Sequence, residues 1–196
     1  MRIAFVTFAV LKQPYGNPEV QEFDDRTPDV FLEAEGSPGF IARAVEVSGS
    51  ELSNFVRDWG KWGKFAVPRF YTWGRETHTD QRASTLSIWE DLGSVLRFVY
   101  AGLHLEALKK RSEWFQKPQW PTYAIWWIPD DYIPTWREAA EKLEKLHDQG
   151  ASPEVFDFKT CFDANGNRVD PSAYKLKHES HGAHSKESVM TATKRT

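Results

Sequence analysis

The stretch that decides the fold is SIWEDLGSVLRFVYAGLHLEALKKRSEWF, residues 87–115. It begins in a short apolar run that predicts a β-strand over 84–90, and Asp91 then has the side chain of a helix N-cap. A helical pattern fills the rest of the stretch, with a kink expected near Gly102. One histidine, His104, lies in the middle of this helix. The stretch therefore predicts a strand followed by a helix and also carries the main candidate for chemistry.

The flanking sequence supplies further strands and helices. Apolar and capped amphipathic patterns predict strands over 2–11, 40–47, 122–128 and 155–162, and helices over 18–35 and 135–148. This order contains two βαβ units with split pairing. We therefore predict an α+β fold of the ferredoxin-like kind, an antiparallel sheet with helices on one face. A second copy in a symmetric homodimer would cover the other face.

Two segments stand apart from this pattern. Residues 48–82 are rich in Gly, Trp and charge, and their three tryptophans indicate an inserted loop that packs as a lid. Residues 172–196 are polar and predict a disordered tail, so the domain is expected to span 1–171. The tail contains the histidine-rich run HESHGAH at 178–184, which we interpret as solvated rather than as a metal site.

Composition excludes several classes of protein. The 196 residues carry 25 basic and 28 acidic side chains, which does not give the basic face of a nucleic-acid binder. The single cysteine, Cys161, allows no disulfide within the chain and favours a reducing, cytoplasmic location. The apolar start of the chain is too short to span a membrane and lacks the features of a signal peptide.

Residues before the second predicted strand and along the third strand and its helix resemble those of a known family. These are GSPGF at 36–40 and Trp89, Glu90, Tyr100, His104, Glu113, Trp114 and Phe115. Over about 1–47 and 84–160 the chain resembles the dimeric α+β barrel superfamily, and within it an uncharacterised branch related to the antibiotic-biosynthesis monooxygenases. The resemblance implies a dimeric barrel. Relatives include cofactor-free oxygenases, polyketide cyclases, lactone isomerases and haem enzymes, so it also implies a small-molecule enzyme of secondary metabolism.

The candidate site centres on His104. Histidine titrates near neutral pH and can both accept and donate a proton. On an ideal helix His104 shares a face with Tyr100 and Leu108, and such a mixed face is costly to bury without a partner. We therefore predict a pocket between this helix and the sheet, with His104 as the acid/base, and with Tyr100 and Tyr123 as hydrogen-bond donors.

The walls of this pocket are expected to be aromatic or apolar. The predicted substrate-binding residues are Phe5, Trp73, Trp89, Leu108, Tyr123 and Trp127. Because strand side chains alternate, only one of Trp126 and Trp127 can face the pocket, and we expect it to be Trp127.

The expected function is that of an enzyme acting on an apolar, aromatic or polyketide-like metabolite without a cofactor. Proton transfer would drive cyclisation, isomerisation, elimination or cofactor-free oxygenation. Two alternatives remain open. His104 could be the axial ligand of a haem. The domain could also be a non-catalytic, dimeric ligand-binding module. His104 itself could be structural, bonded to Glu113 or to a backbone carbonyl.

Overall fold

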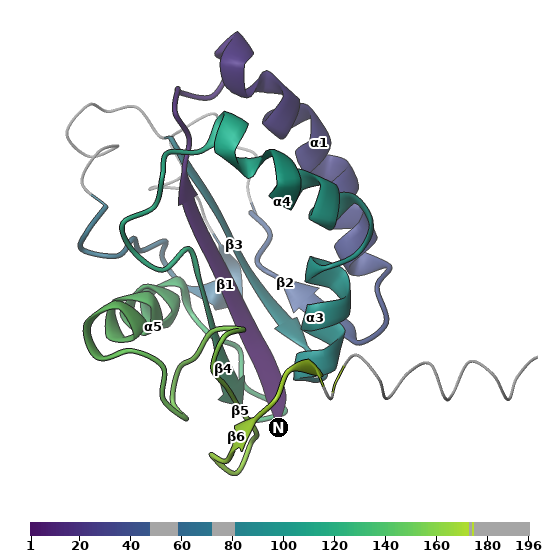
Figure 1. The fold of residues 1–196 in the computed structure, drawn as a ribbon, viewed down its shortest axis with the longest axis vertical. Helices are drawn as coiled ribbons and strands as arrows, with labels where there is room; N and C mark the ends of the chain where they lie inside the picture. The colour runs from purple at the N-terminus through teal and green to yellow at the C-terminus, as the bar shows by residue number, and fades with distance from the viewer. Residues whose placement is uncertain (48–58, 72–80, 173, 175–196) are drawn as a thin grey trace, which may run out of the picture.

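The computed structural model describes residues 1–47, 59–71, 81–172 and 174, and its centre is a four-stranded sheet. The strands are β1 (Arg2–Val10), β2 (Phe40–Arg43), β3 (Arg82–Trp89) and β4 (Tyr123–Ile128). Their order in the sheet is β2-β3-β1-β4, and every neighbouring pair is antiparallel (Figure 1). The fold is therefore α+β with an antiparallel sheet, as the sequence predicts.

The helices begin at the caps that the sequence indicates. They are α1 (Pro18–Glu35), α3 (Leu92–Val99), α4 (Gly102–Trp114) and α5 (Trp136–Gln149), with a short 3-10 helix η1 (Gly60–Trp62). Asn17, Asp91 and Thr135 each accept a hydrogen bond from a backbone N–H in the first turn of α1, α3 and α5. In contrast, α4 has no cap from its own N-cap residue, Ala101.

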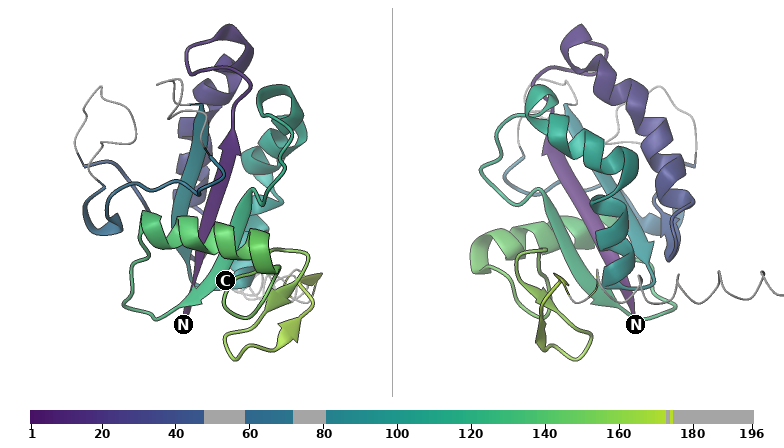
Figure 2. Two further views of the ribbon diagram at one scale, coloured as in Figure 1. Left: turned by 90° about the vertical axis from the view of Figure 1, so that its left-hand side faces the viewer. Right: turned by 45° about the vertical axis from the view of Figure 1, so that its right-hand side comes forward.

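One face of the sheet packs against α3 and the chain after α5. Ile3, Phe5 and Trp89 on this face form a cluster with buried side chains of α3 and with Phe156 and Phe158. Helices α1 and α4 lie side by side on the same side of the sheet, and α4 lies toward the opposite end of the sheet from α3 (Figures 1 and 2). We refer to this side as the α3 face.

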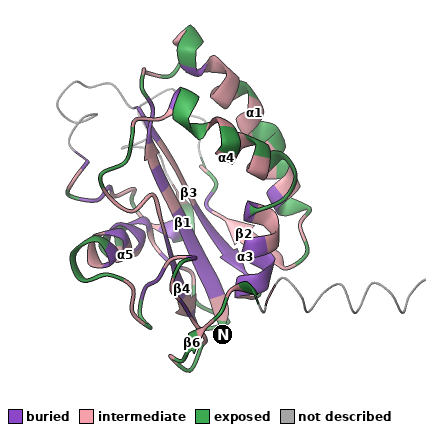
Figure 3. Ribbon diagram, viewed as in Figure 1, coloured by how far each residue is buried: buried purple, intermediate pink, exposed green. Residues whose placement is uncertain are grey.

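The structure corrects the expectation that all helices lie on one face. Helix α5 packs on the opposite face, away from α1, α3 and α4 (Figure 1). There the alternate residues of β1, among them Phe8, cluster with Trp136 and Leu143 of α5. The apolar face of α5, together with residues 62–71, packs on the surface that we expected a second copy to cover. As a result, the central strands are buried from both sides over most of their length (Figure 3).

The insert at 48–82 also differs in part from its prediction. Residues 59–71 contain η1, and Trp62 and Tyr71 are buried in the cluster on the α5 face. This part of the insert therefore packs on the sheet as core. The rest of the insert up to residue 80 lies outside the described residues, as does almost all of the predicted tail.

Residues 155–162 do not form the fifth strand that we expected. Phe156 bridges Ile125 at the outer edge of β4 through two backbone hydrogen bonds of 2.9 Å. A separate two-stranded sheet follows, formed by β5 (Cys161–Phe162) and β6 (Arg168–Val169). Within the described ranges, no helix is long and apolar enough to cross a membrane.

Candidate functional site

His104 lies in the first turn of α4, directly after the short non-helical segment that separates α3 from α4. Helix α3 ends at Val99 and α4 begins at Gly102, whose φ of +49° reverses the local backbone. The spacing rule for one continuous helix therefore does not apply across the break. Our prediction that Tyr100 and His104 share a helix face is wrong for this reason.

A backbone carbonyl fixes the orientation of the imidazole. His104 Nδ1 lies 3.0 Å from the carbonyl oxygen of Val99, the last residue of α3. Because a carbonyl oxygen can only accept, Nδ1 carries the hydrogen, and Nε2 is the acceptor when the ring is neutral. No described residue forms a hydrogen bond with Nε2. The arrangement leaves that nitrogen available to take up a proton.

The surroundings also favour the neutral ring. Burial lowers the pKa of His104 below its usual value of 6.5, because the charged form loses hydration. The hydrogen bond to Val99 and the negative charge of Glu33 act in the opposite direction and raise the pKa. Since burial is the largest effect, the imidazole is mainly neutral at pH 7.

The rings around His104 belong to a chain of aromatic contacts. Phe98 lies 4.7 Å from the imidazole and stacks on Trp89 at 5.1 Å, and Phe40 meets the indole edge-to-face at 5.2 Å. Trp89 is 1% exposed, and its Nε1 donates to Ser87 Oγ at 2.9 Å. The predicted wall residue Trp89 therefore reaches His104 only through Phe98 and is itself core.

A second aromatic group contains the two tyrosines. Tyr123 packs on Phe5 at 6.1 Å and on Phe158 at 5.1 Å, and Tyr100 lies 5.7 Å from Phe158. Burial raises the pKa of both tyrosines, so both are neutral hydroxyls. The predicted site residues thus fall into two aromatic groups, one around His104 and one around Tyr123. Sequence reasoning missed Phe158, although alternating apolar residues at 155–162 pointed to a packed segment.

Of the remaining predicted wall residues, two lie with the cluster on the α3 face and one lies outside the described residues. Trp127 lies on the α3 face, where its Nε1 donates to the Phe162 carbonyl at 2.8 Å. Trp126 lies on the opposite face and donates to Glu138, as the alternation predicts. Leu108 packs at the margin of the α3-face cluster. Trp73 lies outside the described residues.

A row of hydroxyl groups crosses the sheet at Tyr123, next to the aromatic group formed by Tyr123, Phe5 and Phe158. Thr7 of β1 pairs with Thr85 of β3 on one side and with Tyr123 of β4 on the other. The two threonine hydroxyls are 2.7 Å apart, and all three residues are half-buried. Because β1 and β3 are the central strands, incomplete burial here means that the helices cover this part of the α3 face loosely.

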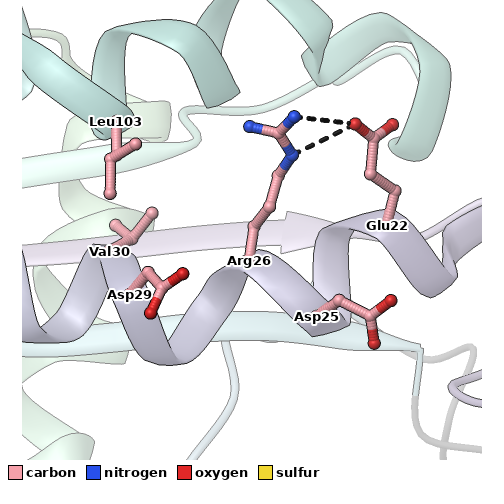
Figure 4. Close-up of a pocket in the computed structure, with 6 residues that line it drawn as sticks. All are labelled: Glu22, Asp25, Arg26, Asp29, Val30 and Leu103. Carbon is pink, nitrogen blue, oxygen red and sulfur yellow. Dashed lines mark hydrogen bonds and ion pairs between the residues drawn. The ribbon is translucent and has the colours of Figure 1, made fainter.

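Two hollows lie along α1. One of about 340 Å³ lies between α1 and α4 (Figure 4); its lining residues are Glu22, Asp25, Arg26, Asp29, Val30 and Leu103. Arg26 turns toward Glu22, which it meets at 2.9 Å, so these charges neutralise each other. The other hollow, of about 390 Å³, lies between α1 and Arg43 of β2. Neither is lined by His104, although Leu103 is its neighbour.

The described residues contain neither a cluster that could hold a metal ion nor a reactive cysteine. Their His, Cys, Asp and Glu side chains form no group of three or more that could hold a metal ion. Cys161 is buried, and burial raises the pKa of its thiol to about 12. A thiol in this state is a poor nucleophile.

Comparison with known proteins gives a family but no activity. The family model described as "Domain of unknown function (DUF3291)" matches residues 2–172. No curated protein and no solved structure matches the chain.

Proposed function

The chain belongs to this family of unknown function, and we propose from its own residues that it is a small-molecule enzyme with His104 as the proton acceptor. The substrate would be apolar, and aromatic or polyketide-like. One observation carries the proposal. The imidazole is half-buried against the ring of Phe98, Nδ1 is held by the Val99 carbonyl, and no described residue is hydrogen-bonded to Nε2. A fixed neutral imidazole is a suitable general base near pH 7.

The proposed step is removal of an acidic C–H or O–H proton. Nε2 takes the proton, the substrate keeps the electron pair as an enolate or phenolate, and the resulting imidazolium still donates from Nδ1 to Val99. Cyclisation, isomerisation and elimination can all follow from such an anion. Oxygenation would also need dioxygen as the oxidant. The same base step therefore supports each of these reaction types.

Exposed apolar side chains at the break between α3 and α4, just before His104 in the sequence, support an apolar substrate. Tyr100 and Leu103, on either side of the helix break, are 44% and 37% exposed. The hydroxyl row of Thr7, Thr85 and Tyr123 offers polar contacts on the sheet. The proposed enzyme would work in the cytoplasm, in secondary metabolism.

A ferredoxin-like unit and a homodimer remain part of the proposal. The order β2-β3-β1-β4 is the one that two split βαβ units generate, which supports the ferredoxin-like unit. Because α5 covers one sheet face, a dimer would have to form through another surface. Light scattering coupled to gel filtration tests this: twice the chain mass supports a dimer, and a single chain mass excludes it.

The haem alternative has one supporting observation. Histidines that bind metals usually donate their second N–H to a carbonyl or carboxylate, as His104 donates to Val99. However, Phe98 packs against the imidazole at 4.7 Å, and neither hollow along α1 is lined by His104. No described hollow places space for a porphyrin against the ring, and we derive no step through haem.

Proton exchange with solvent tests the base directly, before the true substrate is known. Aromatic 1,3-diketones and polyphenols would be incubated with the protein in D₂O, and loss of the acidic C–H signal followed by NMR. We expect faster exchange with the wild type and no acceleration with His104→Asn, which keeps a donor for Val99 but lacks Nε2.

The matched control is His147→Asn, which changes a histidine on α5 that is hydrogen-bonded to its neighbour Asp148. It should exchange like the wild type. If His104→Asn retains the full rate, the base is misassigned. If the compounds quench tryptophan fluorescence but never exchange, the non-catalytic binding module is the better description.

A further inference from the structure

A carboxylate from α1 caps the helix that carries His104. Glu33 Oε1 accepts the backbone N–H of Leu103 at 3.0 Å, and Oε2 accepts the backbone N–H of His104 at 3.1 Å. The first N–H groups of a helix have no partner within the helix, and a nearby negative charge complements its dipole. Since Ala101 provides no side-chain cap, Glu33 takes over this role from another helix.

Gly102, the first residue of α4, leaves the space that this contact needs. A Cβ at Gly102 would lie 1.8 Å from Glu33 Oε1 and 2.8 Å from its Cδ, so any other side chain would displace the carboxylate. The φ of +49° at Gly102 also belongs to the region that glycine adopts most easily. Glu33 and Gly102 are therefore matched to each other, although they lie far apart in the sequence.

We propose that Glu33 is the positioning residue of His104: by clamping the first turn of α4 onto α1, it fixes the backbone from which the imidazole extends. This inference rests on the proposed function, because it assigns Glu33 a part in the same proton transfer. Glu33 accepts the backbone N–H of His104, and the Val99 carbonyl accepts the N–H of its ring. Backbone and ring are thereby both held, which a base needs in order to meet its substrate in one geometry.

The clamp also places a negative charge beside the imidazole. From α3, the ring meets the uncharged Phe98 and the Val99 carbonyl. From α1, the Glu33 carboxylate accepts the backbone N–H of His104, and its charge acts on the ring. Among the described residues, Glu33 is the charged group that affects the pKa of His104, and its negative charge raises this pKa. After proton uptake at Nε2, this charge stabilises the imidazolium and so assists the proposed step.

NMR titration of the histidine ring tests the inference without a substrate. The His104 signal is identified by its loss in His104→Asn. In Glu33→Gln, which keeps an acceptor but loses the charge, we expect the pKa of His104 to fall below that of the wild type. Exchange of the Leu103 and His104 amide hydrogens should become several-fold faster. A structural clamp alone would change exchange but not the ring titration.

Glu106→Gln is the matched control. Glu106 is on the same helix and also meets α1, through Arg26 at 3.6 Å, but it does not contact the capped N–H groups. It should leave the His104 titration unchanged. Should Glu33→Gln fold poorly, Gly102→Ala displaces the carboxylate while keeping its charge in the chain, and it should lower the pKa of His104 in the same direction.

An unchanged titration in both Glu33→Gln and Gly102→Ala would overturn the positioning role. That result is distinct from failure of the proposed function. If Glu33 shifts the ring but His104→Asn keeps the exchange activity, the clamp is real and the base assignment is wrong. If activity needs His104 but both variants titrate normally, the base stands and Glu33 has no part in it.

Discussion

Replacing Gly102 with alanine should destabilise the protein in two ways, by straining the backbone and by displacing the Glu33 cap. A residue other than glycine at a φ of +49° costs about 1–2 kcal/mol. The new methyl group would also overlap Glu33 Oε1 and expel the carboxylate from the N-terminus of α4. Loss of a helix cap costs about 1 kcal/mol. We therefore expect Gly102→Ala to lower the free energy of unfolding by about 2–3 kcal/mol.

Urea denaturation followed by circular dichroism measures this loss. A double-mutant cycle with Glu33→Ala separates the two terms, since without the carboxylate Gly102→Ala should cost only about 1–2 kcal/mol. Gly16→Ala is the control, because its φ is +85° and nothing lies within 4 Å of the new Cβ. Equal costs of Gly102→Ala with and without the Glu33 side chain would refute the clamp.

Three further predictions concern the core, the thiol and pH. Leu143→Ala on α5 should cost about 2–5 kcal/mol in urea denaturation, because this side chain is 1% exposed, whereas Leu32→Ala, 65% exposed, should stay within about 0.5 kcal/mol; similar losses would mean that α5 does not cover the sheet. Cys161 should resist a disulfide reagent such as Ellman's reagent at pH 8 in the native protein and react after unfolding, since its pKa is raised to about 12; fast native reaction would contradict its burial. The pKa of His104 is lowered on folding, so the unfolded chain binds more protons as the pH falls; the stability linked to His104 is therefore present above about pH 6.5 and lost as the pH falls through the folded pKa. Unfolding midpoints between pH 5 and 8 should show this slope in the wild type and a shallower one in His104→Gln; equal slopes would argue against a buried neutral ring.

Local signals in the sequence predicted the elements of the fold well. The capping residues Asn17, Asp91 and Thr135 mark the starts of three helices because a side-chain acceptor near the first N–H groups is a local requirement. The antiparallel pairing follows from the order of the elements. The face on which α5 packs did not follow, because an amphipathic helix buries its apolar side equally well against either face of a sheet.

The candidate site was harder to predict because it depends on contacts between distant residues. A kink was expected near Gly102, but the pattern could not tell that the break separates Tyr100 from the face of His104. Glu33 gave no signal, since an acidic residue in a helix usually faces solvent. Its role appears only when α1 lies beside α4. The alternation of Trp126 and Trp127, in contrast, is a local property and was predicted correctly.

The most direct test of the proposed base is the protonation state of the His104 ring, observed by ¹⁵N NMR of its two nitrogens at pH 7. The contact with the Val99 carbonyl predicts a neutral ring that carries its hydrogen on Nδ1, with Nε2 unprotonated. A ring with its hydrogen on Nε2, or one that is fully charged at this pH, would contradict the account.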